Sequence, residues 1–419
     1  MSTLSRRDFT RSLALGSLAG FGATLLDVDR AFAAPIHYDD WKSIRDRFVL
    51  ARGLAPMNAA NLCPSSADVI EALYENTRAV DRDPSQQNRA RFSQSKESLR
   101  RKVATFLNVT PEEILLTRNT SEANNQVSAG LDLKPGDEVV IFADNHPSNH
   151  QAWRERAKRH GFTVKILEQP NPHPGAQYYV DAVTRALTPQ TKVLTFTHLT
   201  STVGDLMPAA ELCRIARERG VLTLCDGAQS FGLLNVDLQA IQPDFYSGSA
   251  HKWPCGAREV GILYVRMDIQ EMFWPAMYSA YTGQTGLSRT HEGMGQRDDA
   301  VFIAFETALD LQLEIGRAAV EQRSRMLAQS LMEGISKLDG IKLWTSRDPA
   351  KSAAVVSFQP GSLDIRKLSD ALYQKDKIAV ATRGGADRPG LRISPHFYNL
   401  EEEIDRTVAA IDRYLKRGL

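Results

Sequence analysis

Helix-like and strand-like segments alternate along most of this chain, from about residue 66 to residue 265. Amphipathic stretches with helical spacing lie at residues 66–81, 94–107, 151–160 and 209–219. Short apolar runs, which are the candidate strands, lie at residues 114–117, 138–142, 163–167, 193–197, 221–225 and 261–265. Apolar runs joined by helices are typical of a parallel sheet with both faces covered. The sequence therefore predicts an α/β fold built on a large, mainly parallel sheet.

A region with a different pattern follows this alternation. One long helical pattern covers residues 302–338. Strands are expected at residues 354–358, 378–381 and 391–394, before a closing helix at residues 400–417. With 42% hydrophobic and 24% charged residues, the chain has the composition of an ordinary globular protein. We predict a large domain over residues 34–310 and a smaller C-terminal α+β domain over residues 311–419.

The first 33 residues have the pattern of an export signal. Arg6 and Arg7 precede an apolar stretch of about 15 residues, and Ala31-Phe32-Ala33 follows it. Twin arginines, a modest apolar stretch and an A-x-A site resemble the bacterial twin-arginine signal. A membrane anchor is the alternative, but such a stretch is too short to span a bilayer comfortably. We expect the twin-arginine translocation machinery to export the folded chain to the periplasm, where the mature protein has no membrane contact.

Charge and cysteine content argue against several classes of partner. The chain has 51 Lys plus Arg and 50 Asp plus Glu, a formal charge of +1, so neither nucleic acid nor an anionic membrane surface is expected as a partner. The four cysteines, Cys63, Cys213, Cys225 and Cys255, include no C-x-x-C spacing. They match neither a disulfide scaffold nor a metal-binding pattern, so we expect structural or unpaired thiols and no bound metal.

Polar residues follow several of the expected strands, at the sheet edge where open α/β sheets bind their ligands. Thr120 and Ser121 open a helix after the first run. His146 follows the second run, and Asp226 follows the fifth. Hydroxyl groups at a helix start either cap the helix or bind a phosphate. A lone His or Asp at such a place is most often a loop or capping residue, so each motif is weak by itself.

One lysine stands in an unusual setting. Lys252 follows Ser249, Ala250 and His251 and precedes Trp253. A surface lysine is the ordinary explanation, but a lysine among apolar and cationic neighbours has a depressed pKa and can form a Schiff base with an aldehyde. The order of these motifs along the chain indicates a site more strongly than any one of them does.

In this order the motifs resemble the class V aminotransferase family of enzymes that use pyridoxal 5'-phosphate (PLP), which includes cysteine desulfurases and isopenicillin N epimerases. The resemblance extends from Asn58-Ala59-Ala60 to residues 392–402, which is nearly the whole mature chain. It implies fold type I, in which a mainly parallel sheet of seven strands lies in the large domain. It also implies a homodimer whose active sites lie at the subunit interface.

The resemblance implies a role for each motif residue. Lys252 would hold PLP as a Schiff base and later move the α-proton of the substrate. Asp226 would keep the pyridine nitrogen protonated, and His146 would stack on the cofactor ring. Gln229 and Ser201 would bind the phenolic oxygen. The residues that match the phosphate-binding group are Thr120, Ser121, Ser249 and His251.

The same resemblance implies substrate contacts and a contact from the second subunit. Arg392 matches the arginine that pairs with the substrate carboxylate, for which its planar fork is suited. Asn58 and Ala59 are the other substrate-binding positions that we expect. Gln296 stands at the position of a family threonine that contacts the phosphate group bound by the partner subunit.

One departure from the family bears on the reaction. Cysteine desulfurases carry a nucleophilic cysteine in the loop before the strand of Arg392, and residues 380–387 of this chain contain none. The short loop with Gly384 and Gly385 instead resembles the isopenicillin N epimerase-like branch, whose exported members include periplasmic siderophore-tailoring enzymes. Sulfur mobilisation is therefore a minor alternative.

We expect a periplasmic PLP enzyme that acts on an amino group of an amino acid, a siderophore or a peptide by aminotransferase-type chemistry. Epimerisation or racemisation, and β-elimination, stay open because the resemblance does not separate them. A nucleotide-dependent oxidoreductase lacks support, since no G-x-G-x-x-G follows the early strands. A non-catalytic binding protein with the same fold is the alternative from a different class.

Overall fold

The computed structural model describes residues 40–384 and 387–419. Arg6, Arg7 and Ala31-Phe32-Ala33, and with them the predicted export signal of residues 1–33, lie outside the described residues. Gly385 and Ala386 of the expected short loop lie outside them as well. None of the helices in the described part combines the length and the apolar character needed to span a bilayer.

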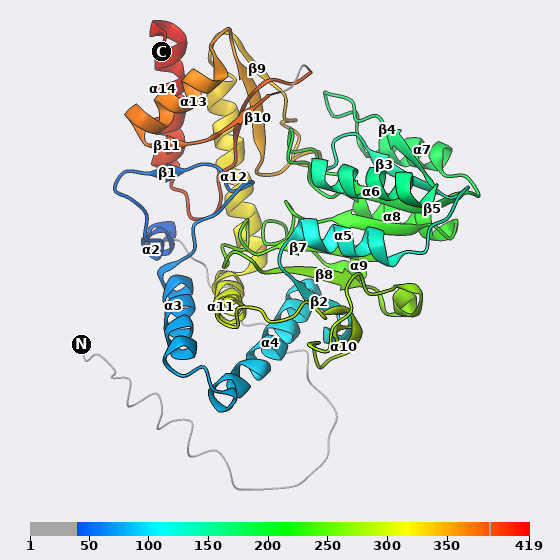
Figure 1. Cartoon of the computed structure of the whole chain (residues 1–419). Helices are drawn as coiled ribbons and strands as arrows, with labels where there is room; N and C mark the ends of the chain where they lie inside the picture. The colour runs from blue at the N-terminus through cyan, green and yellow to red at the C-terminus, as the bar shows by residue number, and fades with distance from the viewer. Residues whose placement is uncertain (1–39, 385–386) are drawn as a thin grey trace, which may run out of the picture. The chain divides into compact units, whose positions relative to one another are not determined.

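Seven strands form the larger sheet (Figure 1). They are β2 (Ile114–Thr117), β3 (Glu138–Phe142), β4 (Thr163–Leu167), β5 (Thr191–Thr197), β6 (Leu222–Asp226), β7 (Phe245–Ser249) and β8 (Gly261–Val265). Their order across the sheet is β2-β8-β7-β6-β5-β3-β4, and β8 runs antiparallel to the other six. The prediction of an α/β fold with a mainly parallel sheet is confirmed.

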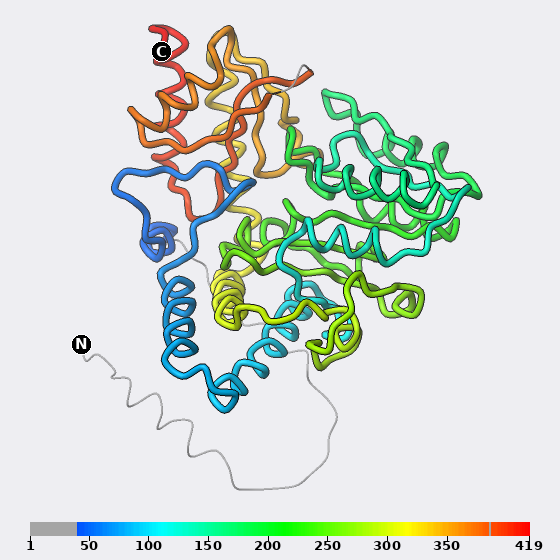
Figure 2. Tube along the Cα trace, in the orientation of Figure 1, coloured from blue at the N-terminus to red at the C-terminus, as the bar shows by residue number. Residues whose placement is uncertain are grey.

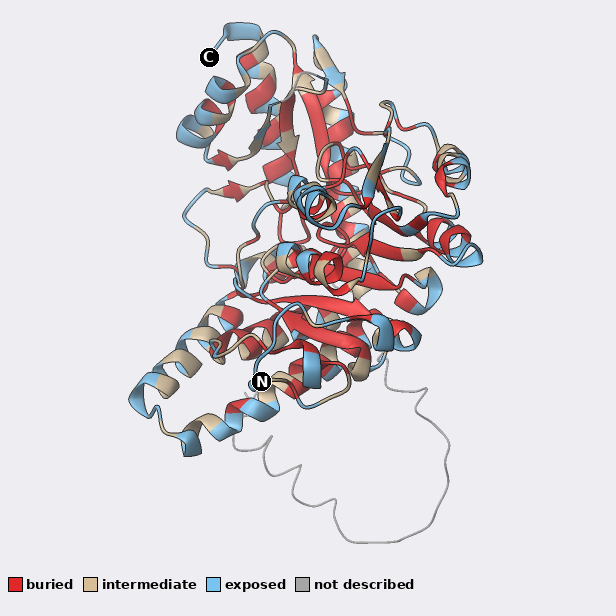
Figure 3. Ribbon diagram, turned by 45° about the vertical axis from the view of Figure 1, so that its right-hand side comes forward, coloured by how far each residue is buried: buried red, intermediate tan, exposed pale blue. Residues whose placement is uncertain are grey.

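Apolar side chains of the strands build two cores, one on each face of this sheet. The first core joins the strands to α5 (Thr120–Gly130) and α6 (Pro147–His160). The second joins them to α4 (Gln86–Leu107), α7 (Ala176–Ala186) and α8 (Ala209–Glu218). Neighbouring residues such as Ile141 and Phe142 belong to different cores, because successive side chains of a strand point to opposite faces. Helices therefore cover both faces, and the central strands are buried along their length (Figure 3).

A four-stranded antiparallel sheet forms in the C-terminal part. Its order is β12 (Ala381–Arg383), β13 (Gly390–Ile393), β10 (Val356–Pro360) and β9 (Ile341–Leu343). Helix α13 (Ile365–Asp376) packs against β12 and β13, and α14 (Glu401–Arg417) packs against α13. These elements agree with the α+β character predicted for this region.

A two-stranded parallel sheet connects the beginning of the described chain to this region. Strand β1 (Ala55–Pro56) pairs with β11 (Ile378–Ala379), and the blue and red parts of the trace run side by side there (Figure 2). The single strand predicted at residues 378–381 is therefore wrong, because β11 and β12 belong to different sheets. The other short elements are α2 (Trp41–Asp46), α9 (Leu238–Ile241), α10 (Ser288–His291) and the 3-10 helices Pro111–Glu113 and Met267–Met272.

The segment 302–338, predicted as one helix, consists of two helices. Helices α11 (Ala300–Ile315) and α12 (Arg317–Ile335) meet at Gly316, whose φ of 93° lies outside the helical range. Helix α11 packs against α3 (Ala67–Arg82) and α4, whereas α12 packs against α14. The break therefore directs the chain from one group of helices to another. The domain boundary predicted between residues 310 and 311 falls inside α11 and stays a prediction.

Candidate active site

The carboxyl ends of the central strands surround a cavity of about 290 Å³. Its lining residues are Asn61, Asn119, Thr120, Ser121, His146, Ser148, Asp226, Ala228, Ser249, His251 and Lys252. Residues far apart in the sequence meet there because parallel strands end at the same edge of a sheet. The cavity brings together seven of the site residues predicted from the sequence, which are Thr120, Ser121, His146, Asp226, Ser249, His251 and Lys252.

Asp226, the last residue of β6, has a fixed orientation in the cavity wall. Its Oδ2 accepts a hydrogen bond of 2.8 Å from Nδ2 of Asn124, and its Oδ1 accepts one of 3.0 Å from the backbone N–H of Ala228. The hydroxyl of Ser247 in turn donates to Oδ1 of Asn124 at 2.7 Å. A carboxylate held in this way can serve as the partner of a protonated pyridine nitrogen.

Lys252 lies in the turn that follows β7. Its backbone carbonyl accepts a hydrogen bond of 2.9 Å from the N–H of Cys255. The next residue, Trp253, is fully buried. No described residue forms a hydrogen bond or an ion pair with Nζ of Lys252. Burial, assisted by the charge of Arg392 and opposed by that of Asp226, lowers the pKa of Lys252 to about 8. The amine is therefore both unpaired and easier to deprotonate than an ordinary lysine.

The first turn of α5 forms a group of hydrogen-bond donors at the cavity rim. The backbone N–H of Thr120 donates to Oγ of Ser249 at 2.8 Å, and the two hydroxyl oxygens lie 2.7 Å apart. The hydroxyl of Ser121 donates to Oγ of Ser148 at 3.2 Å. Free N–H groups at a helix N-terminus and adjacent hydroxyls are suited to a phosphate group.

Two histidines complete the cavity wall. Nδ1 of His146 accepts a hydrogen bond of 3.3 Å from the backbone N–H of Ser148 and so caps α6. Burial and the charge of Lys252 lower the pKa of His146. Burial, followed by the charges of Lys252 and Arg258, lowers the pKa of His251 to about 4. Near pH 7 the His251 ring is therefore neutral, with one nitrogen as a donor and one as an acceptor.

Arg392 is held outside the rim of this cavity by two polar contacts. Its Nη1 donates to the carbonyl oxygen of Ser201 at 3.1 Å, and its Nη2 donates to Oδ1 of Asn58 at 3.1 Å. The N–H of the buried Ala59 donates to the carbonyl oxygen of Ser394 at 3.0 Å, which places the segment of Asn58 beside β13. Ser201 and Asn58 thus position Arg392. The substrate contacts of Arg392, Asn58 and Ala59, and the cofactor contact of Ser201, stay predictions.

Gln229 and Gln296 do not line the cavity. The side-chain amide of Gln229 donates to the carbonyl oxygen of Ala60 at 3.0 Å and accepts from Nε1 of Trp253 at 2.8 Å. Gln229 therefore supports the residue next to Lys252. Gln296 is exposed and is not among the residues that line the cavity. A cofactor contact of either glutamine stays a prediction.

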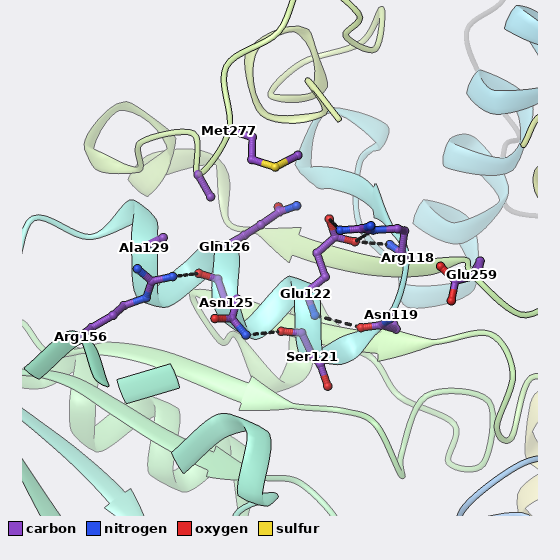
Figure 4. Close-up of a pocket in the computed structure, with 11 residues that line it drawn as sticks. Arg118, Asn119, Ser121, Glu122, Asn125, Gln126, Ala129, Arg156, Glu259 and Met277 are labelled. Atoms are coloured by element: carbon purple, nitrogen blue, oxygen red, sulfur yellow. Dashed lines mark hydrogen bonds and ion pairs between the residues drawn. The ribbon is translucent and has the colours of Figure 1, made fainter. Parts of the chain in front are cut away.

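A larger cavity of about 650 Å³ adjoins the same helix start and shares Asn119 and Ser121 with the first. Figure 4 shows Arg118 paired with Glu122 at its wall and Met277 above it. The Arg118–Glu122 ion pair measures 3.1 Å. The first turn of α5 therefore adjoins cavities on two sides.

An ion pair near the site was missed from the sequence. Arg388 binds both carboxylate oxygens of Asp144, at 2.7 and 2.6 Å, and the hydroxyl of Thr202 donates to Asp144 at 2.8 Å. Asp144 lies just after β3, and Asp226 is the last residue of β6. A search for polar residues at the carboxyl ends of strands, which selects Asp226, would therefore also have selected Asp144. Arg388 has no comparable signal in the sequence.

The four cysteines are free, buried thiols. Burial raises the pKa of Cys225 and Cys255 well above the ordinary range and that of Cys213 to about 12. Thiols with a raised pKa are poor nucleophiles. The described residues include no group of three or more side chains that could hold a metal ion.

Comparison with known proteins relates this geometry to a family. The family model for class V aminotransferases matches residues 58–407. The isopenicillin N epimerase of Streptomyces clavuligerus is 29% identical over 394 residues, which cover 89% of this chain and 98% of that protein. A probable cysteine desulfurase of Methanothermobacter thermautotrophicus is 28% identical over 389 residues, which cover 87% of this chain and 95% of that protein.

Solved structures share the fold. The ligand-free cysteine desulfurase of Thermococcus onnurineus NA1 has a TM-score of 0.80 at 23% identity, over 90% of this chain and 98% of that one. A mutant of C-DES, with glycine covalently linked to its PLP cofactor, has a TM-score of 0.81 at 23% identity, over 88% of this chain and 98% of that one. The family model covers most of the sequence, and the chain therefore belongs to the class V aminotransferase family of PLP-dependent enzymes.

Proposed function

We propose that this enzyme uses PLP to act on the amino group of an amino acid, or of an amino-acid unit in a siderophore or peptide, by aminotransferase-type chemistry. The observation that carries the proposal is Lys252. Its unpaired amine has a pKa of about 8 and lies in the same cavity as Asp226. The positive charge of Arg392 helps to lower this pKa. A half-buried lysine amine with a lowered pKa and no hydrogen-bond or ion-pair partner among the described residues is suited to react with an aldehyde.

The residues around the cavity fit PLP. The unpaired amine of Lys252 is suited to the aldehyde carbon, and the fixed carboxylate of Asp226 is suited to the ring nitrogen. The N–H of Ser121, in the first turn of α5, and the hydroxyls of Thr120, Ser121 and Ser249 are suited to a phosphate group. When bound, PLP supplies an electron sink that stabilises negative charge on the carbon next to the amino group.

The residues of this chain then have distinct tasks. Lys252 would hold the cofactor, and with substrate bound its neutral amine would be the base that takes up the α-proton. A pKa of about 8 leaves a useful fraction of neutral amine near neutral pH. Asp226 presents a fixed acceptor to the ring nitrogen throughout. Arg392 binds the substrate carboxylate through a guanidinium that Ser201 and Asn58 already orient.

The cysteines argue against sulfur mobilisation, although cysteine desulfurases are among the relatives. Cys213, Cys225 and Cys255 are buried with raised pKa values, and the loop before β13 has no cysteine. Epimerisation is the second candidate, because isopenicillin N epimerases are relatives over nearly their whole length. It requires a second proton donor on the face opposite Lys252, a role that His146 would have to fill.

The visible absorption spectrum of the mature protein tests the proposal. The wild type and the control Lys367→Ala, which changes an exposed lysine, are expected to show a yellow band that borohydride removes. Lys252→Ala is expected to lack the band and to keep its circular dichroism. A colourless wild type that cannot be loaded with PLP would refute the proposal and favour a binding protein.

Product analysis of the loaded enzyme with amino-acid substrates in D₂O then identifies the reaction. Aminotransferase chemistry is expected to give a keto acid and pyridoxamine phosphate. Epimerisation would give the D-amino acid with deuterium at the α-carbon, and β-elimination would release the β-substituent. Either of these products without keto acid would overturn the aminotransferase assignment.

We also propose that the enzyme works in the periplasm as a homodimer. The sequence pattern of Arg6, Arg7 and the A-x-A site supports export. Replacing both arginines with lysine is expected to retain the protein in the cytoplasm, as cell fractionation would show. Export of this variant at the wild-type level would contradict the twin-arginine route.

A further inference from the structure

Two arginines stand side by side on one face of the four-stranded sheet. In the pairing of β12 with β13, Ala381 lies opposite Arg392 and Arg383 lies opposite Gly390. Opposed residues of an antiparallel pair share a face, and every second residue returns to it. Arg383 and Arg392 therefore extend from the same face, and both donate to the carbonyl oxygen of Ser201, at 3.4 and 3.1 Å.

Neither arginine has a carboxylate partner among the described residues. The third arginine nearby, Arg388, takes both oxygens of Asp144. The Nε atoms of Arg383 and Arg392 are buried and have no hydrogen-bond partner. Burial lowers the pKa of both, and the charge of Arg383 assists burial in lowering that of Arg392 to about 10. Two like charges with unsatisfied buried donors are costly, which indicates that anions complete this pair.

The two arginines differ in their relation to the reactive lysine. Asn58 and the carbonyl oxygen of Ser201 hold Arg392 beside the cavity, where its charge lowers the pKa of Lys252 and of His146. The charge of Arg383 acts on Arg392, its neighbour on the sheet. A ligand that reaches out from Lys252 would therefore meet Arg392 first and Arg383 beyond it.

We propose that the substrate carries two carboxylates, and that Arg383 is the residue that selects the second one. Arg392 binds the carboxylate next to the reactive amino group. Arg383 binds a carboxylate farther along the same molecule, as its planar fork permits. The inference rests on the proposed function and narrows its substrate class to amino dicarboxylates or their peptide-linked forms.

Calorimetric titration of the PLP-loaded enzyme with unreactive acids tests the inference. The probes are succinate, glutarate and adipate, each compared with the monocarboxylate of equal chain length. We expect one dicarboxylate to bind about tenfold more tightly than its monocarboxylate, as a charge-assisted contact would allow. Arg383→Gln is expected to remove this preference, by weakening dicarboxylate binding much more than monocarboxylate binding. Arg392→Gln is expected to weaken both kinds of acid.

Two further variants and one spectrum make the outcome decisive. Arg383→Lys keeps the charge and is expected to restore part of the preference. Arg347→Gln removes an exposed arginine and is expected to change nothing. Equal binding of both kinds of acid by the wild type, or an equal loss of both in Arg383→Gln, would overturn the inference. A yellow wild type without the preference refutes this inference alone, whereas a wild type that forms no link between Lys252 and PLP refutes the proposed function.

Discussion

At the scale of single residues, the chemistry of Lys252 depends on charges that reach it from different elements. Asp226 at the end of β6 favours the protonated amine, whereas burial and Arg392 on β13 favour the neutral one. Cys63 has a smaller effect in the same direction as Asp226. Burial is the largest of these effects, so the pKa lies at about 8 instead of 10.5.

The rate at which the apoenzyme captures PLP should report this balance. Only the neutral amine attacks the aldehyde, so the rate is expected to rise with pH and to level off above about pH 8. Arg392→Gln removes a repelling charge and is expected to move the midpoint upward by about one unit. Asp226→Asn removes an attracting charge and is expected to move it downward. Stopped-flow absorbance measures the rate, and Nα-acetyl-lysine amide controls for the ionisation of PLP itself. A midpoint near 10.5 in the wild type would contradict this balance of burial and charge.

The residues around Lys252 show what a sequence can reveal about a site. Asp226 and His146 were predictable because each follows a recognisable apolar run and so lies at the sheet edge. Asn124, which orients Asp226, is a polar residue one turn into a helix, where nothing in the sequence distinguishes it from a surface position. The sequence places Gln229 at the site. Its contact with Trp253 could not be predicted, because the two residues are brought together by the tertiary fold and not by a local sequence pattern.

At the scale of elements, the turn between β5 and α8 joins the two larger sheets. The hydroxyl of Thr345 donates to the carbonyl oxygen of Val203 at 2.6 Å, and that of Ser357 donates to the carbonyl oxygen of Thr202 at 2.6 Å. The same turn supplies the carbonyl oxygen of Ser201 to Arg392. The position of Arg392 thus depends on this turn.

Gly204 is the position where this turn tolerates no side chain. Its φ is +76°, and a Cβ there would lie 2.2 Å from the carbonyl oxygen of Val355. Gly204→Ala is therefore expected to lower the free energy of unfolding by about 3 kcal/mol, from backbone strain and from overpacking together. Gly53→Ala is the matched control, because Gly53 has a φ of +74° and open space around it. It is expected to cost about 1 kcal/mol in urea unfolding of the mature protein. Equal costs for the two variants would show that the contact with Val355 does not limit the turn.

Element boundaries were predictable where the apolar pattern was continuous. The runs at 114–117, 138–142, 163–167 and 261–265 became strands with those bounds. Strand β7 was missed because Ser247, Gly248 and Ser249 interrupt its apolar character, and those small residues are needed where the chain passes close to Phe231 and to α5. The break at Gly316 was missed because helical spacing continues on both sides of it.

At the scale of the whole molecule, one segment exposes more apolar surface than a monomer needs. The side chains of Met272, Trp274, Met277, Tyr278 and Tyr281 are between 45% and 78% exposed. Ala276 and Met277 also line the 650 Å³ cavity beside the first turn of α5. Clustered exposed aromatic residues mark interaction surfaces. We propose that a second copy of the chain covers this segment and brings the partner's Gln296 toward the phosphate-binding end of the cavity.

Sedimentation of the mature protein tests this assembly. The wild type is expected to sediment with twice the mass of the mature chain at micromolar concentration. The double variant Trp274→Lys, Tyr278→Lys is expected to weaken the dimer roughly a thousandfold, because two buried aromatic residues at an interface contribute on the order of 2 kcal/mol each. Tyr373→Lys changes a comparably exposed tyrosine on α13 and is expected to leave the dimer intact.

If the partner's Gln296 contributes to phosphate binding, the monomeric variant should also bind PLP more weakly while its circular dichroism stays unchanged. A wild type that sediments as a monomer would show that each chain forms its site alone.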